Sequence, residues 1–88
     1  RMKLSIVGTG YVGLVSGACL AERGHDVTCV DVEAAKVESI NAGRAPIHEP
    51  GLPELLQANV GRRLRATRDL AKAVRDSEMT MIAVGTPA

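Results

Sequence analysis

Short, mostly apolar runs alternate with longer mixed segments along the chain. The runs at residues 4–7, 27–30, 64–66 and 79–84 predict four β-strands. Between them, apolar residues recur at the three- and four-residue spacing of amphipathic helices. Strands that alternate with helices give a parallel sheet with helices on both faces, so the pattern predicts an α/β fold.

The segments between the strands predict four helices. We expect the first around residues 14–21, the second over 33–42, a short third from Pro53, and a fourth that Thr67 caps. Glycines at positions 24, 43 and 61 suit left-handed helix ends. The apolar residues assigned to the last three helices are Ala34, Val37, Ile40, Leu55, Leu56, Val60, and an inner face of Leu70, Ala71 and Val74.

Three glycines lie where the first strand leads into the first helix. Gly8 allows a sharp turn, Gly10 leaves room for a pyrophosphate, and Gly13 permits close packing of helix and strand. Asp31 ends the second strand, where a carboxylate accepts hydrogen bonds from both hydroxyls of an adenosine ribose. This is the dinucleotide-binding fingerprint of a Rossmann-type sheet, and the carboxylate favours NAD over NADP.

Three other interpretations stay open from the residues alone. The glycines fit a tight strand-to-helix turn that binds nothing, or the flavin-binding unit of an oxidase. A half-domain that holds NAD or ADP-ribose without chemistry is the third. A Rossmann domain normally has six strands in the order 3-2-1-4-5-6, so four strands predict a partial domain over residues 1–88, with order 3-2-1-4.

Composition excludes several classes of protein. The chain has 88 residues, of which 45% are hydrophobic and 24% charged, and its net charge is +1, so it is expected to be globular rather than disordered. Arginines at 62, 63, 65 and 68 lack aromatic partners and predict a solvated rim, not a nucleic-acid site. No apolar run is long enough for a membrane span and no signal peptide precedes the first strand, so we expect a cytoplasmic protein.

Neither cysteine nor histidine predicts chemistry in this chain. Cys19 and Cys29 lack metal-ligand spacing and a nearby histidine, so both are expected to be reduced core residues. His25 and His48 fall in expected loops and receive no catalytic role. Arg1 before Met2 is typical of an expression-vector remnant.

Four segments in order resemble one enzyme family. They are Gly8 to Leu14, Asp31 with Lys36, the Pro-Ile-His-Glu-Pro-Gly-Leu loop at 46–52, and the Val-Gly-Thr-Pro segment at 84–87. Together they are similar to the N-terminal part of the UDP-glucose/GDP-mannose dehydrogenase family. The helix at 14–21 resembles the UDP-glucose 6-dehydrogenase branch more than the GDP-mannose branch.

The resemblance implies a set of cofactor contacts. The backbone from Gly8 and Gly10 to Gly13, including Tyr11 and Val12, would hold the pyrophosphate, and Asp31 the adenosine ribose. Lys36 would lie beside that ribose, although from its position alone it reads as a solvated charge on a helix. Thr86 would approach the cofactor near the end of the fourth strand. Glu49 is expected to hold its loop through backbone N–H groups.

The resemblance also implies an activity for the parent protein. Such enzymes oxidise the C6 hydroxyl of a nucleotide-linked hexose to a carboxylate with two NAD molecules, through a thiohemiacetal and a thioester on a cysteine. Neither cysteine of this chain matches that nucleophile, so catalytic residues are expected outside it. The nucleotide sugar would bind through the missing half, and a homo-oligomer is expected.

The fourth strand would form an open edge of the sheet. With order 3-2-1-4, residues 79–84 pair with the first strand on one side and with nothing on the other. We expect the 88-residue chain to self-associate through this edge, and to be inert towards UDP-glucose with NAD.

Overall fold

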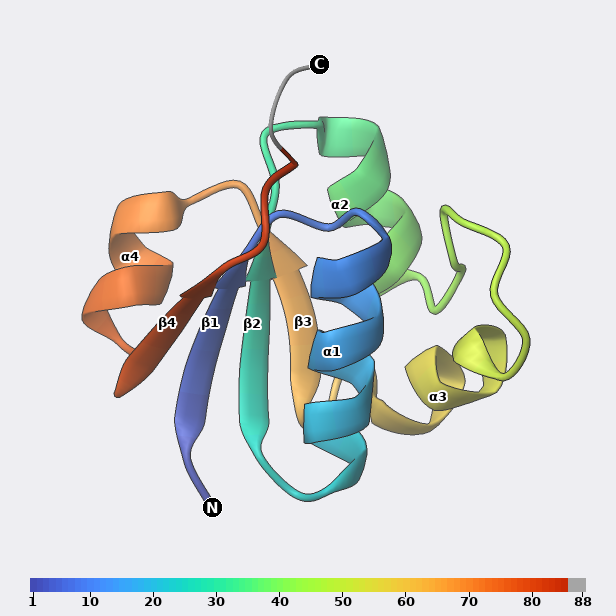
Figure 1. Cartoon of the computed structure of the whole chain (residues 1–88), viewed down its shortest axis with the longest axis horizontal. Helices are drawn as coiled ribbons and strands as arrows, with labels where there is room; N and C mark the ends of the chain where they lie inside the picture. The colour runs from blue at the N-terminus through green and yellow to red at the C-terminus, as the bar shows by residue number, and fades with distance from the viewer. Residues whose placement is uncertain (86–88) are drawn as a thin grey trace.

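The computed structural model describes residues 1–85, which form a parallel sheet with helices on both faces (Figure 1). The strands are β1 (Lys3–Val7), β2 (Asp26–Val30), β3 (Leu64–Thr67) and β4 (Met79–Ile82). The helices are α1 (Tyr11–Glu22), α2 (Ala34–Asn41), α3 (Leu52–Asn59) and α4 (Leu70–Arg75). The strands lie in the order β3-β2-β1-β4, all parallel to their neighbours, which confirms the predicted fold.

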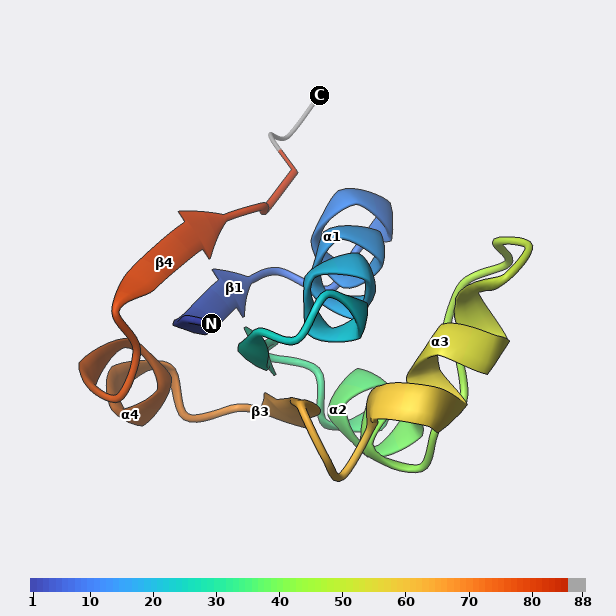
Figure 2. The ribbon, with the colours of Figure 1, turned by 90° about the horizontal axis from the view of Figure 1, so that it is seen from below.

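The core lies on one face of the sheet. The register pairs Ile6 of β1 with Cys29 of β2, and Val27 of β2 with Leu64 of β3. Because side chains alternate along a strand, these residues share a face. α1, α2 and α3 lie over that face (Figure 2). Its fully buried hydrophobic residues are Ile6, Leu14, Ala18, Ala21, Val27, Cys29, Ile40, Leu56 and Leu64.

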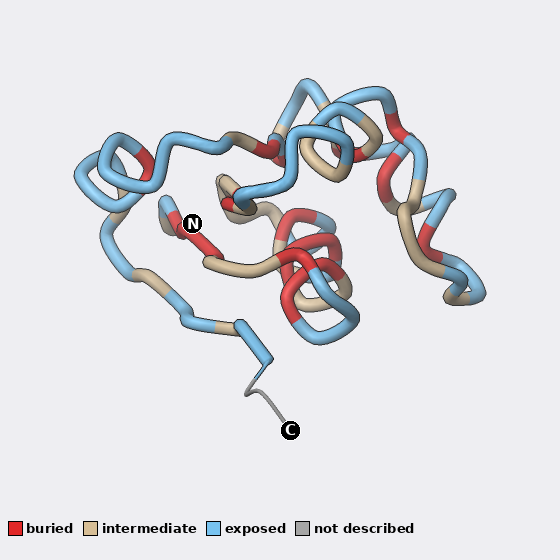
Figure 3. Tube along the Cα trace, turned by 90° about the horizontal axis from the view of Figure 1, so that it is seen from above, coloured by how far each residue is buried: buried red, intermediate tan, exposed pale blue. Residues whose placement is uncertain are grey.

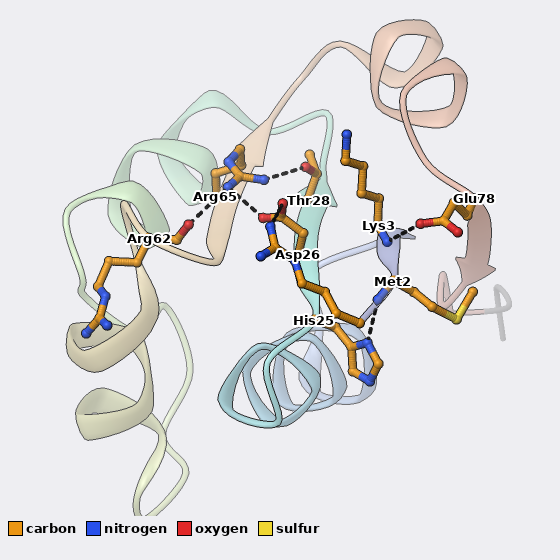
Figure 4. Close-up of polar contacts among 9 residues, drawn as sticks. Met2, Lys3, His25, Asp26, Thr28, Arg62, Arg65 and Glu78 are labelled. Carbon is orange, nitrogen blue, oxygen red and sulfur yellow. Dashed lines mark hydrogen bonds and ion pairs between the residues drawn. The ribbon is translucent and has the colours of Figure 1, made fainter.

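The opposite face of the sheet is polar where α4 lies over it (Figure 2). Arg65 of β3 donates to a carboxylate oxygen of Asp26 at 3.1 Å and to the hydroxyl of Thr28 at 3.3 Å (Figure 4). At the neighbouring strand, the main-chain N–H of Lys3 donates to Glu78 at 2.9 Å. An open cavity of about 660 Å³ is lined by residues of this face and of α4, most of them polar, so the helix has little apolar surface to pack against.

Two expectations for α4 were wrong. Its N-cap is Asp69, whose carboxylate accepts from the N–H of Lys72 at 3.0 Å, while Thr67 ends β3 and accepts from the N–H of Asp69. The buried residue of the helix is Ala73, whereas Leu70 and Val74 are 49% and 42% exposed, and Ala71 is exposed too. The apolar spacing predicted an inner face, but the polar sheet surface below offers no partner for it.

The two cysteines have different environments. Cys29 is buried in β2, and burial raises the pKa of its thiol to about 12. Cys19 is exposed, which corrects its assignment to the core. The buried residues of α1 follow the spacing of Leu14, Ala18 and Ala21, and one position past Ala18 the helix turns its side chain towards solvent.

The two edges of the sheet are treated differently. At the β3 edge, the side-chain amide of Asn41 donates to the carbonyl of Ala66 at 2.9 Å and accepts from its N–H at 2.8 Å. At the other edge, β4 is shorter than predicted and ends at Ile82, although Ala83 N–H still donates to Val7. The exposed fractions of Ile82 and Val84 are 71% and 59%, and this segment is largely exposed in Figure 3.

Candidate dinucleotide-binding site

Gly8 and Gly13 are required by the protein itself. Gly8 has φ +106°, and a Cβ there would lie 2.7 Å from the carbonyl oxygen of Ala83. A Cβ on Gly13 would lie 1.9 Å from the carbonyl oxygen of Gly8. These values confirm the sharp turn at Gly8 and the close packing at Gly13 that the sequence predicts.

Gly10 has a different environment. Its backbone has ordinary dihedral angles, as the N-cap of α1, and a Cβ there would meet no atom within 4 Å among the described residues. Neither backbone conformation nor packing therefore requires glycine at this position. What remains is open space beside the turn, which fits the approach of a pyrophosphate.

The N-terminus of α1 supplies donors for that space. The first hydrogen bond of the helix runs from Leu14 N–H to Gly10 at 3.0 Å, so the N–H groups of Tyr11, Val12 and Gly13 precede the helical ladder. Tyr11 is 58% and Val12 62% exposed, and no side chain of residues 1–85 caps this end. Free N–H groups and the positive end of the helix dipole favour an anion here.

Asp31 lies at the carboxyl end of β2, beside the glycine turn. One of its oxygens, Oδ2, accepts from the N–H of Thr9 at 3.1 Å and from the Thr9 hydroxyl at 2.5 Å. The other, Oδ1, accepts from the N–H of Glu33 at 3.0 Å. The main chain of the same turn is tied to β2 by a bond from Gly8 N–H to Val30 at 2.8 Å. The carboxylate and the turn therefore form one hydrogen-bonded unit.

These contacts keep the Asp31 carboxyl ionised. Burial alone raises its pKa, but the hydrogen bonds from Thr9 and Glu33 lower it, and so does the nearby charge of Lys36. Burial is the largest single effect, but the lowering effects together outweigh it, so the pKa of Asp31 lies below its usual range. Lys36, half-buried on α2, is thus close enough to Asp31 to act on it electrostatically.

The structure brings most of the predicted site residues to one place. Gly8, Gly10, Gly13 and Asp31 meet where β1 and β2 end, and the first turn of α1 adds Tyr11 and Val12 (Figure 1). Thr86 lies outside the described residues. Sequence reasoning missed Thr9, because the residue between two glycines gave no sign that its side chain bonds to Asp31.

The loop around Glu49 is held by different hydrogen bonds from those expected. Its connection to α3 is made by the main chain, since Leu52 N–H donates to the Glu49 carbonyl at 3.1 Å. Within residues 1–85 the Glu49 carboxylate has no hydrogen bond, so the predicted anchoring through that group was wrong. An open cavity of about 690 Å³ lies among residues 43–57, away from the glycine turn.

The described part of the chain has neither a metal-ligand cluster nor a membrane-spanning helix. Residues 1–85 contain no cluster of three or more histidine, cysteine, aspartate or glutamate side chains that could hold a metal ion. None of the helices in this range has the length and apolar character needed to cross a membrane.

Comparison with protein families identifies the chain. A family model described as the NAD binding domain of the UDP-glucose/GDP-mannose dehydrogenase family matches residues 2–88. The chain belongs to this family. NAD is therefore the cofactor of the domain, and the open space at Gly10, the free N–H groups of α1 and the ionised Asp31 fit its ADP half.

Curated relatives of both branches match equally well. GDP-mannose 6-dehydrogenase of Pseudomonas savastanoi pv. phaseolicola and UDP-glucose 6-dehydrogenase of Rhizobium meliloti are each 52% identical to this chain over 87 residues. Each match covers 98% of the chain and 20% of the relative. The NAD-binding domain described here thus spans about a fifth of its relatives' length, and identity does not separate the two sugars.

Solved structures of both GDP-mannose and UDP-glucose dehydrogenases also match this chain. A ternary complex of GDP-mannose dehydrogenase from Pseudomonas aeruginosa has a TM-score of 0.93 at 52% identity. A UDP-glucose dehydrogenase from Pyrobaculum islandicum has a TM-score of 0.94 at 42% identity. In both cases the match covers 99% of this chain and 20% of the solved one.

Proposed function

We propose that this chain holds the ADP half of NAD, with the pyrophosphate at the turn between β1 and α1 and the adenosine ribose at Asp31. The observation that carries the proposal is the open space at Gly10, because neither packing nor backbone conformation explains a glycine there. Lys36 and Thr86 complete the proposed contacts, one beside the ribose and one near the end of β4.

The parent protein, in this proposal, oxidises the C6 hydroxyl of a nucleotide-linked hexose to a carboxylate. Two NAD molecules each accept a hydride, and water supplies the second oxygen of the product. UDP-glucose, giving UDP-glucuronate, is the proposed substrate, and GDP-mannose is the alternative, since relatives with both names share 52% identity with the chain. The catalytic groups and the sugar site belong to the rest of the protein, which we propose is a cytoplasmic homo-oligomer.

Cofactor choice provides the direct test. Calorimetric titration of the 88-residue chain with NAD, ADP-ribose, NADP and FAD should show binding of the first two, weaker binding of NADP, and none of FAD. A 2′-phosphate would face the Asp31 carboxylate, and like charges repel. Equal or tighter binding of NADP would contradict the assignment of Asp31, and binding of FAD alone would contradict the cofactor.

Gly10→Val tests where the pyrophosphate binds. The branched side chain would fill the open space, so affinity for ADP-ribose should fall by at least about tenfold. The unfolding midpoint should fall only by the small cost of a less favourable N-cap residue, because a Cβ at position 10 meets no atom within 4 Å among the described residues. Gly10→Ala, with a smaller side chain, should give an intermediate loss. Full affinity in the valine variant would place the phosphates elsewhere.

Substrate choice is tested in the longest protein that contains this chain. NADH formation is measured with UDP-glucose and with GDP-mannose, and two NADH per sugar are expected with the true substrate. The 88-residue chain alone is expected to form no NADH with either sugar.

A further inference from the structure

Thr9 has an unexpected environment for a residue in a ligand-binding turn. It is fully buried, although it lies between two glycines and only two positions before the exposed Tyr11. A buried hydroxyl needs a hydrogen-bond partner, and the partner of this one is Asp31, 22 positions further along the chain. The side chain of Thr9 thus points away from the proposed phosphate site and towards the proposed ribose site.

The hydrogen bonds of Thr9 occupy one side of the Asp31 carboxylate. Both the N–H and the hydroxyl of Thr9 donate to Oδ2, and the N–H of Glu33 donates to Oδ1. An ionised carboxylate has about four acceptor positions, two on each oxygen. Three are filled by the protein, and the remaining one is on Oδ1.

We propose that Thr9 is a positioning residue for cofactor recognition, which holds Oδ2 of Asp31 so that only Oδ1 is presented to a single hydroxyl of the adenosine ribose. This inference rests on the proposed function of the chain. It narrows the expectation that Asp31 accepts from both ribose hydroxyls.

A carboxylate held in this way also discriminates between cofactors. Three hydrogen bonds from two different segments prevent the side chain from rotating away from a bulky or charged group. A 2′-phosphate would therefore meet a fixed negative charge, whereas a free carboxylate could turn aside. Thr9 contributes in this way to the preference for NAD without contacting the cofactor.

Thr9→Val in the 88-residue chain tests the proposal, because valine keeps the shape of threonine and removes only the hydroxyl. NAD affinity should fall by about 3- to 10-fold, which is less than the full value of a hydrogen bond to a charged group, because Thr9 acts through Asp31 and does not contact the cofactor. The ratio of NADP to NAD dissociation constants should also decrease, since Asp31 is then held by two hydrogen bonds in place of three. Thr9→Ser, which restores a hydroxyl, should recover both values.

Thr28→Val is the matched control. It removes a threonine hydroxyl from the polar face of the sheet, where Arg65 is its partner at 3.3 Å. Its NAD affinity and cofactor ratio should equal those of the unmodified chain. An unchanged cofactor ratio in Thr9→Val would overturn the proposal, even if that variant were less stable.

The pH dependence gives a reading that a purely structural role would not change. The hydrogen bond from the Thr9 hydroxyl lowers the pKa of Asp31, and its loss should raise that pKa. As the pH is lowered, NAD affinity should therefore begin to fall at a higher pH in Thr9→Val than in the unmodified chain. Identical pH profiles would also overturn the proposal.

Ligand analogues test the single-hydroxyl prediction without altering Thr9. Affinities are measured for two ADP-ribose analogues that lack the 2′- or the 3′-hydroxyl of the adenosine ribose. Each is titrated into the unmodified chain and into Asp31→Asn. Asp31 should show energetic coupling with one ribose hydroxyl only. Coupling with both would contradict the proposal, whereas failure of the unmodified chain to bind ADP-ribose at all would contradict the proposed function instead.

Discussion

The two edges of the sheet differ in how the protein treats their free backbone groups. At the β3 edge, the Asn41 side chain bonds to both the N–H and the carbonyl of Ala66, as a neighbouring strand would. At the β4 edge, Met79, Met81 and Ile82 are 51%, 36% and 71% exposed. A blocked edge resists pairing with other chains, and an open apolar edge favours it.

The two edges also differ in how far helices and side chains cover them. α2 packs against β3, and its last residue, Asn41, gives the backbone groups of Ala66 the hydrogen bonds that a neighbouring strand would give. β4 pairs with β1 only, among the strands of the described chain, and its apolar side chains are exposed. Helices α1 to α3 lie on the side of β2 and β3 (Figure 2). The exposed apolar surface of the sheet is therefore at β4.

Asn41→Ala should have the largest effect on stability, because it removes the protection of the β3 edge. It leaves the N–H and carbonyl of Ala66 without their amide partner, at a cost of about 1–3 kcal/mol. Urea unfolding measures this change. Gln57→Ala, an exposed residue on α3, is the control and should alter stability by less than about 0.5 kcal/mol. Equal stabilities of the two variants would mean that Asn41 does not protect the edge.

Ile82→Lys should protect the β4 edge. The unmodified chain is expected to self-associate through this edge, and a charge there should shift it towards a monomer, since edge lysines oppose strand pairing. Stability should change by less than about 0.5 kcal/mol because Ile82 is largely exposed.

Size-exclusion chromatography with light scattering measures the association. Val32→Lys adds the same charge at an exposed position outside the strands and should leave the association unchanged. A stable monomer of the unmodified chain over a wide concentration range would contradict the expected association.

Acid should produce a small loss of stability at the ion pair between β2 and β3. Hydrogen bonding to Arg65 lowers the pKa of Asp26 below its ordinary value of 3.8, and Arg1 adds to this. The ion pair with Arg65 therefore stabilises the fold above about pH 4, and this stabilisation is lost as pH falls through the lowered pKa of the folded state. A partly exposed pair contributes about 0.2–1 kcal/mol. Arg65→Gln should reduce this part of the acid dependence, as measured by urea unfolding at several pH values.

The sequence was sufficient to predict features that depend on neighbouring residues in the chain. The strand positions and the turns at Gly8 and Gly13 follow from local pattern, and strand order follows from the fold to which that pattern points. The fingerprint also located Asp31 at the end of β2. The left-handed φ of Gly8 and the contact of Gly13 with the Gly8 carbonyl both arise within one strand-turn-helix unit.

Features that depend on distant partners were missed or wrong. Asn41 and Ala66 are 25 positions apart, and Thr9 and Asp31 are 22 apart, so no local pattern indicates either pair. The inner face of α4 was wrong for a related reason. Leu70 and Val74 have helical spacing, but whether such a stripe is buried depends on the sheet below, which is polar here.

The three glycines differ in whether the protein has room for a side chain, and this difference can be looked for in related sequences. Replacement at Gly8 or Gly13 brings a side chain against main-chain atoms, so those positions are constrained whether or not a nucleotide binds. At position 10 a Cβ would meet no atom within 4 Å among the described residues, so the proposed pyrophosphate contact is what favours glycine there. A descendant of this domain that has lost its cofactor is therefore free to accumulate side chains at position 10 while keeping glycine at 8 and 13, and that combination marks a retired binding site.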